Sequence, residues 1–160
     1  MRHTLALAAL GLAIVAFGPA AAAARDCRKG EQLIFSCTLK GKVASVCATQ
    51  GQATYRYGRP GSPEMEIASG EGRAFQSVVI GGGGGSQTSL RFSNKGFNYI
   101  VSSGEQGSLH DSPGKTWSVL TILQGDKIIA SRTCKLTSPW DRIRESGLPD
   151  DPDERFVAWY

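Results

Sequence analysis

Short apolar and β-branched runs recur every ten to twelve residues along most of this 160-residue chain, separated by glycine, proline, asparagine and serine. Alternation is cleanest where Leu90 and Phe92 flank Arg91, and where Phe97 and Tyr99 share one face of a strand. Such spacing is typical of antiparallel sandwiches and barrels. The sequence therefore predicts an all-β fold, a single antiparallel β-sandwich of about eight strands.

Nine segments carry this pattern. The predicted strands span residues 32–39, 43–49, 53–57, 65–68, 75–80, 86–93, 97–102, 115–123 and 127–134. The tripeptide 94–96, Asn-Lys-Gly, predicts a tight hairpin between two of them. The five glycines at 81–85 precede a strand rather than a helix, so they predict a flexible hairpin connection and not a phosphate-binding loop.

One short C-terminal helix is predicted after the last strand. Ser138 can cap its first turn, Pro139 suits the first helical position, and Gly147 ends it. Ile143 and Leu148 would seat this segment on the sheet. The apolar residues that close the chain are expected to pack against the body or a partner: Phe156, Val157, Trp159 and Tyr160.

The first 24 residues have the pattern of a secretory signal peptide. A short cationic start precedes an almost wholly apolar run at 4–17, and the small residues Ala22 and Ala24 stand before a cleavage point at Arg25. An uncleaved membrane anchor is the alternative. We expect a leader at 1–24, one domain at 25–160 without a membrane span, and a periplasmic or secreted protein.

All four cysteines lie after the predicted cleavage point: Cys27, Cys37, Cys47 and Cys134. An even count in an exported protein indicates two disulfides. The favoured pairing of the three possible ones is Cys37–Cys47 with Cys27–Cys134, because the strands at 33–39 and 43–49 flank a polar turn centred near residue 42. The wide spacing of the cysteines argues against a zinc site, so no metal is expected.

The basic residues are unevenly distributed. Of 18 basic and 14 acidic residues, the leader holds one base, and residues 141–155 hold six acids and three bases. Residues 25–140 therefore hold 14 bases and 8 acids, a net charge of +6. This body could bind an acidic protein or an anionic envelope component, and the alternative is a solubilising surface with a self-complementary acidic tail. The candidate binding bases are Arg56, Arg59, Arg73, Arg91 and Lys95.

Strand alternation predicts the exposure of two of these bases. Arg91 should face solvent if Leu90 and Phe92 face the core. Tyr55 and Tyr57 should point into the core and leave the arginine between them, Arg56, exposed. Nucleic-acid binding is therefore not expected from this aromatic and basic run.

No segment assembles a convincing active site. The single histidine after the leader, His110, lies in a polar loop, and the carboxylate pair Glu64 and Glu66 fits a solvent-facing strand edge. We therefore expect a non-catalytic binding protein with no cofactor. A small hydrolase of envelope polymers, using His110 with Glu64 or Glu66, is the alternative from another class.

Three runs carry a resemblance to known proteins: Phe-Ser-Cys at 35–37, Lys-Val-Ala-Ser-Val-Cys at 42–47 and Tyr-Arg-Tyr-Gly-Arg-Pro-Gly at 55–61. With the glycine-rich stretch before residue 90 and the late cysteine, they resemble a family of small exported bacterial β-rich proteins of uncharacterised function. More distantly, the arrangement is similar to the periplasmic inhibitors of invertebrate-type lysozyme. This resemblance implies a β-sandwich and a non-catalytic role.

The inhibitor family carries a Ser-Gly-x-x-Tyr loop that enters the lysozyme cleft. Its nearest counterpart here is the stretch 103–107, in which Ser103 and Gly104 match and Gly107 stands at the tyrosine position. The resemblance implies a lysozyme inhibitor as the runner-up function, with Ser103 and Gly104 as possible binding residues.

Overall fold

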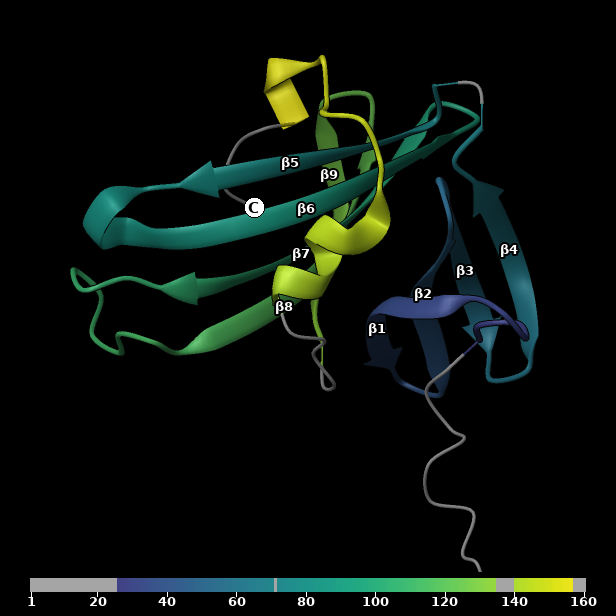
Figure 1. The fold of residues 1–160 in the computed structure, drawn as a ribbon, viewed down its shortest axis with the longest axis horizontal. Coiled ribbons are helices and arrows are strands. Elements are labelled where there is room, and N and C mark those ends of the chain that lie inside the picture. Colours follow the sequence, from purple (N-terminus) through teal and green to yellow (C-terminus); the bar gives the residue numbers. More distant parts are fainter. Residues whose placement is uncertain (1–25, 71, 135–139, 157–160) are drawn as a thin grey trace, which may run out of the picture.

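The chain folds into two antiparallel sheets packed face to face (Figure 1). The computed structural model describes residues 26–70, 72–134 and 140–156, and the predicted leader lies outside them. The first sheet contains β1 (Gln32–Leu39), β2 (Lys42–Thr49), β3 (Gln52–Arg59) and β4 (Ser62–Ala68). The second contains β5 (Ala74–Ile80), β6 (Gly85–Asn94), β7 (Phe97–Gln106), β8 (Thr116–Gln124) and β9 (Lys127–Thr133).

The predicted all-β class and sandwich architecture are confirmed. Strand order follows chain order in both sheets, so each sheet is a simple meander. The nine predicted strands are all present, and the largest difference is that β7 continues four residues past its predicted end. The glycine run connects β5 to β6 through a 3₁₀ turn, η1 (Gly82–Gly84), as the hairpin prediction requires.

Two hairpin turns depend on left-handed backbone conformations. Lys40 and Gly41 join β1 to β2 with φ of 40° and 85°, and Lys95 and Gly96 join β6 to β7 with φ of 50° and 80°. Positive φ at both central residues matches the right-handed twist of the flanking strands. The second pair confirms the hairpin predicted at 94–96.

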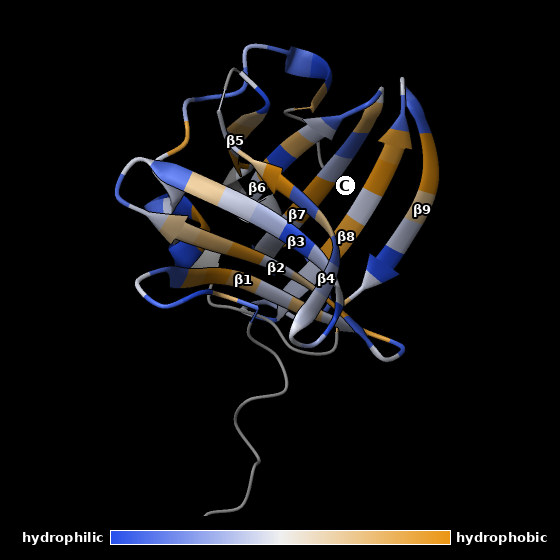
Figure 2. Ribbon diagram, turned by 90° about the vertical axis from the view of Figure 1, so that its right-hand side faces the viewer, coloured by the Kyte–Doolittle hydropathy of each residue, from blue (hydrophilic) through white to orange (hydrophobic). Residues whose placement is uncertain are grey.

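The core lies between the inner faces of the two sheets. Phe35, Val46 and Tyr55 from the first sheet pack in one cluster with Leu90 and Phe92 from the second. All five are at most 1% exposed. In Figure 2, β8 shows apolar bands separated by a paler one, which matches its adjacent apolar pairs at 119–120 and 122–123.

The C-terminal segment packs first against the core between the sheets and then on the outer face of the second sheet. Its helical part is the 3₁₀ helix η2 (Trp140–Ser146) rather than an α-helix, and it packs against β6, β7 and β1. Ile143 and Leu148 are buried, as predicted. A second 3₁₀ turn, η3 (Glu154–Phe156), buries Phe156, whereas the other predicted apolar C-terminal residues lie outside the described part.

The end of this segment also protects the edge of the second sheet. The amide of Gln76 on β5 donates to the carbonyl of Pro149 at 2.8 Å, and the amide of Asp151 donates to the carbonyl of Gln76 at 2.7 Å. An exposed strand edge is a template for pairing with another chain. Residues 149–151 pair with the edge of β5 at Gln76 and so protect it there.

All four cysteines form disulfides, but the predicted pairing is wrong. Cys27 bonds to Cys47, and Cys37 bonds to Cys134. The first bond holds the N-terminal segment against the outer face of the first sheet. The second joins β1 to the residue that follows β9, so it links the two sheets. The described part of the chain has no free cysteine.

The register of the first hairpin explains the difference. Leu39 pairs with Lys42, so the turn has only two central residues and lies earlier than the sequence suggested. This register sets Cys37 opposite Ala44. Because side chains alternate along a strand, Cys47, three residues beyond Ala44, faces away from Cys37. The two cysteines therefore lie on opposite faces of the sheet.

None of the helical segments in residues 26–70, 72–134 and 140–156 has the length and apolar character that crossing a bilayer requires.

Candidate functional site

Arg56 is buried, contrary to the prediction that it is exposed. It lies on the outer face of β3 and is 1% exposed. Its Nη1 and Nη2 donate to the carboxylate of Glu31 at 2.6 and 2.8 Å, and Nη1 also donates to the carbonyl of Asp26 at 3.3 Å. Glu66, opposite on β4, lies 3.3 Å from Nε. The N-terminal segment 26–31 therefore covers this face, which strand alternation does not reveal.

The Arg56–Glu31 pair should make the fold sensitive to acid. The hydrogen bond from Arg56 holds the pKa of Glu31 below its usual value of 4.5. Because the folded pKa is lowered, the stabilisation is complete above the unfolded pKa and is lost as the pH falls through the folded one. We expect Glu31→Gln to lower the free energy of unfolding clearly at about pH 7 and much less at about pH 3. Urea denaturation at both pH values measures this, and an equal loss at both would contradict it.

Arg91 is also covered, so the prediction that it faces solvent is wrong. Its Nε and Nη2 donate to the two carboxylate oxygens of Asp151, each at 2.6 Å. The guanidinium lies over the rings of Phe75 and Phe156, 4.8 and 4.3 Å from their centroids. The side chain does point away from the core, but the C-terminal segment packs on that face. The acidic tail thus pairs with the basic body at this position.

The remaining candidate bases do not form one patch. Arg73 and Lys95 line the same hollow of about 410 Å³ beside the β6–β7 turn, together with Asn94 and Asn98. Arg59 ends β3 in the other sheet and is exposed. The structure therefore brings together only two of the five candidate bases.

Ser103 and Gly104 lie inside β7 and not in a loop. Ser103 is buried, and its Oγ is 2.5 Å from Oγ of Ser118 on β8. A Cβ at Gly104 would lie 2.2 Å from the carbonyl oxygen of Ser86 and 2.6 Å from the ring of Trp117. This glycine allows close packing between strands. Both residues therefore belong to a strand and not to a loop such as the resemblance implied.

His110 and the carboxylate pair occupy different parts of the molecule. His110 Nε2 is 2.9 Å from the carbonyl oxygen of Gly84, and it shares a hollow of about 420 Å³ with Glu105. Glu64 and Glu66 lie on β4, in the other sheet (Figure 1). The structure does not bring His110 together with Glu64 or Glu66.

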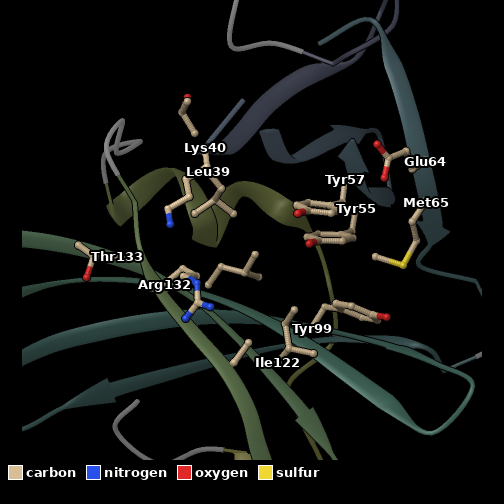
Figure 3. A pocket seen from close by; sticks show the side chains of 13 residues that line it. Leu39, Lys40, Tyr55, Tyr57, Glu64, Met65, Tyr99, Ile122, Arg132 and Thr133 are labelled. Atoms are coloured by element: carbon tan, nitrogen blue, oxygen red, sulfur yellow. The ribbon is translucent and has the colours of Figure 1, made fainter. Parts of the chain in front are cut away.

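A cleft of about 670 Å³ lies between the two sheets, lined by residues of β1, β3 and β4 from the first sheet and of β7, β8 and β9 from the second (Figure 3). Residues from both sheets line it, and the β1–β2 turn stands at its rim. Its half-buried apolar lining consists of Leu39, Tyr57, Met65, Tyr99, Ile122 and Ala130.

This cleft exposes apolar surface that the fold could otherwise bury. Five of these half-buried residues pack against the core cluster on one side and line the cleft on the other. Burying the remaining apolar surface of such side chains is favourable by roughly 25 cal/mol per Å². Concave, mainly apolar sites of about 300–1,000 Å³ are typical of small-molecule binding. We therefore take this tyrosine-lined cleft as the candidate functional site.

Tyr55 provides a polar group at the inner wall of the cleft. Its ring is 5.6 Å from that of Tyr99 and 5.7 Å from that of Phe92, and the residue is 1% exposed. Its phenol oxygen points into the cleft (Figure 3). This oxygen makes no hydrogen bond to any part of the chain that the structure describes. Burial, with a smaller contribution from Tyr57 and Tyr99, raises the pKa of Tyr55, so the hydroxyl stays protonated.

The carboxylate at the rim is neutralised. Glu64 accepts a hydrogen bond from Nζ of Lys42 at 2.6 Å, and this bond raises the pKa of Lys42. The same ammonium lies 5.3 Å from the ring centroid of Tyr57. These contacts fix one wall of the cleft and leave little net charge there.

The donor groups at the N-terminal disulfide do not form an available metal site. In the described residues, the one grouping with metal-ligand spacing is Cys27, Glu31 and Cys47. The two sulfurs are bonded to each other, and the carboxylate accepts hydrogen bonds from Arg56. These donors are engaged within the fold.

Comparison with protein-family models, curated proteins and solved structures finds no match for this chain. The candidate site therefore stands on its geometry. Sequence reasoning assigned Tyr55 and Tyr57 to the core, and Tyr99 to a half-buried strand face. Nothing in the alternation of residues indicates that the two sheets diverge at these positions.

Proposed function

We propose that this chain is a non-catalytic periplasmic or secreted binding protein that holds a small apolar molecule in the tyrosine-lined cleft. The observation that carries the proposal is the hydroxyl of Tyr55, which makes no hydrogen bond within the described residues and points into a cleft lined by half-buried apolar side chains. A ligand in the cleft could accept a hydrogen bond from this hydroxyl, while its apolar part packs against the lining.

The proposed location rests on two features. The first 24 residues have the pattern of an exported leader, and the chain forms two disulfides, which persist in oxidising compartments. Both support a place outside the cytoplasm, where a binding protein meets envelope or external molecules.

Filling the cleft should abolish ligand binding. Ala130 lines the cleft from β9, opposite Ile122, whereas the next residue, Ser131, is exposed and points to the other face of the strand. N-phenyl-1-naphthylamine, a neutral apolar dye, fluoresces on entering apolar sites. We expect the wild-type protein to bind this dye and Ala130→Phe to weaken its affinity by about tenfold or more, because the new ring occupies the cleft.

Ser131→Phe is the matched control, since it adds the same ring to the outer face of the same strand. It should bind the dye as the wild-type protein does, with thermal unfolding confirming that both variants fold. Absence of dye binding by the folded wild-type protein, or equal binding by Ala130→Phe, would overturn the proposal.

A further inference from the structure

Two cations stand at one side of the tyrosine-lined cleft without an acidic partner. Lys40 lies in the β1–β2 turn and Arg132 on β9, and both line the cleft and are exposed. Neither makes an ion pair within the described residues, where the Arg132 side chain donates a hydrogen bond from Nη1 to the carbonyl of Ser131. Among the described residues that line the cleft, the only carboxylate is that of Glu64, which is already paired with Lys42.

Figure 3 shows that these cations are separated from the carboxylate. Lys40 and Arg132 lie on the side of Leu39, whereas Glu64 and Met65 lie on the opposite side. The cleft is therefore electrostatically asymmetric, with its positive charge concentrated at one end.

The tyrosine hydroxyls add hydrogen-bond donors to this positive end. The phenol oxygens of Tyr55 and Tyr57 point from their rings toward the side where Leu39 and Arg132 lie (Figure 3). A protonated phenol can donate a hydrogen bond, as can an ammonium or a guanidinium group. Donors from both sheets thus face the same part of the cleft, while Met65, Tyr99 and Ile122 supply its apolar part.

We infer that the cleft selects an anionic amphiphile, a single-chain molecule whose carboxylate or phosphate head lies between Lys40 and Arg132 and whose apolar chain lies along Tyr99 and Ile122. The inference rests on the proposed function and names the chemical class of its ligand. Guanidinium and ammonium groups bind carboxylates and phosphates through charge-assisted hydrogen bonds, and these are stronger than neutral ones. A cationic head would find no free carboxylate among the described residues of the lining.

The test is displacement of N-phenyl-1-naphthylamine by amphiphiles that share a twelve-carbon chain and differ in the head. Dodecanoate and dodecyl phosphate should displace the dye at concentrations about tenfold lower than dodecyltrimethylammonium and dodecanol do. Inorganic phosphate alone should not displace it, because it lacks the apolar chain. The stronger of the two anionic competitors identifies the preferred head.

Charge-removing variants distinguish recognition of the anionic head from binding in the apolar part of the cleft. Lys40→Gln with Arg132→Gln should weaken both anionic competitors by about tenfold and leave affinity for the neutral dye unchanged. Lys29→Gln with Lys127→Gln removes the same charge from exposed positions outside the cleft lining and should change neither. Dye binding with equal competition by anionic and cationic chains, or an unaffected Lys40/Arg132 variant, would overturn this inference and leave the proposed function standing. Failure of the wild-type protein to bind the dye would overturn the proposed function itself.

Discussion

Replacing Cys37 and Cys134 together by alanine should lower the free energy of unfolding by about 4.7 kcal/mol, whereas replacing Cys27 and Cys47 should lower it by about 3.3 kcal/mol. The two bonds close loops with sequence separations of 97 and 20. A longer loop removes more conformational entropy from the unfolded chain, so its disulfide stabilises the fold more. The longer bond also joins β1 to the end of the second sheet, so its loss frees the two sheets from a covalent link.

Urea denaturation of both double variants at one pH measures the difference, which loop entropy sets at about 1.4 kcal/mol. Alanine is the appropriate replacement because all four positions are buried or half-buried, where a serine hydroxyl would need a partner. Peptide mapping of the native protein provides the independent check of the pairing. An equal or larger loss from the Cys27–Cys47 pair would contradict the loop-entropy account.

The strands were predictable because their signals are local. The segment 32–39 has the predicted bounds, and β6 differs from its prediction by one residue at each end. Turn residues such as Gly41 and Gly96 mark the strand ends to within a few positions. Pairing register is harder to predict: the partner of Cys37 is Ala44 and not Cys47, and a shift of three residues places Cys47 on the other face of the sheet. That shift produced the wrong disulfide prediction.

The candidate site was not predictable because it depends on contacts between distant segments. Alternation correctly places the side chains of Arg56 and Arg91 outside the sandwich core. It does not show that segments 26–31 and 149–156 then cover them. Likewise, alternation places Tyr99 on a core-facing side, but the cleft that it lines depends on how the two sheets meet. No spacing along the chain encodes it.

Removing the carboxylate of Asp151 should cost about 3–5 kcal/mol of stability, because it leaves a largely buried arginine unpaired. The side chains of Arg91 and Asp151 are 10% and 2% exposed and share two hydrogen bonds of 2.6 Å. The matched control is Asp126→Ala, because Asp126 pairs with Arg155 at 2.7 Å but is 74% exposed. Exposed pairs contribute between zero and about 1 kcal/mol, so this control should change stability little.

The double variant Arg91→Met with Asp151→Leu tests whether the loss comes from the unpaired charge. It should be more stable than Asp151→Ala, because replacing both members of a buried pair by apolar groups removes the unpaired buried arginine.

Loss of Asp151 should also free residues 149–151 from the edge of β5. Hydrogen exchange at the amide of Gln76, which donates to the carbonyl of Pro149, should therefore accelerate. Equal stability of the Asp151→Ala and Asp126→Ala variants would show that the acidic tail only solubilises the body, and unchanged exchange at Gln76 would show that the edge holds without this ion pair.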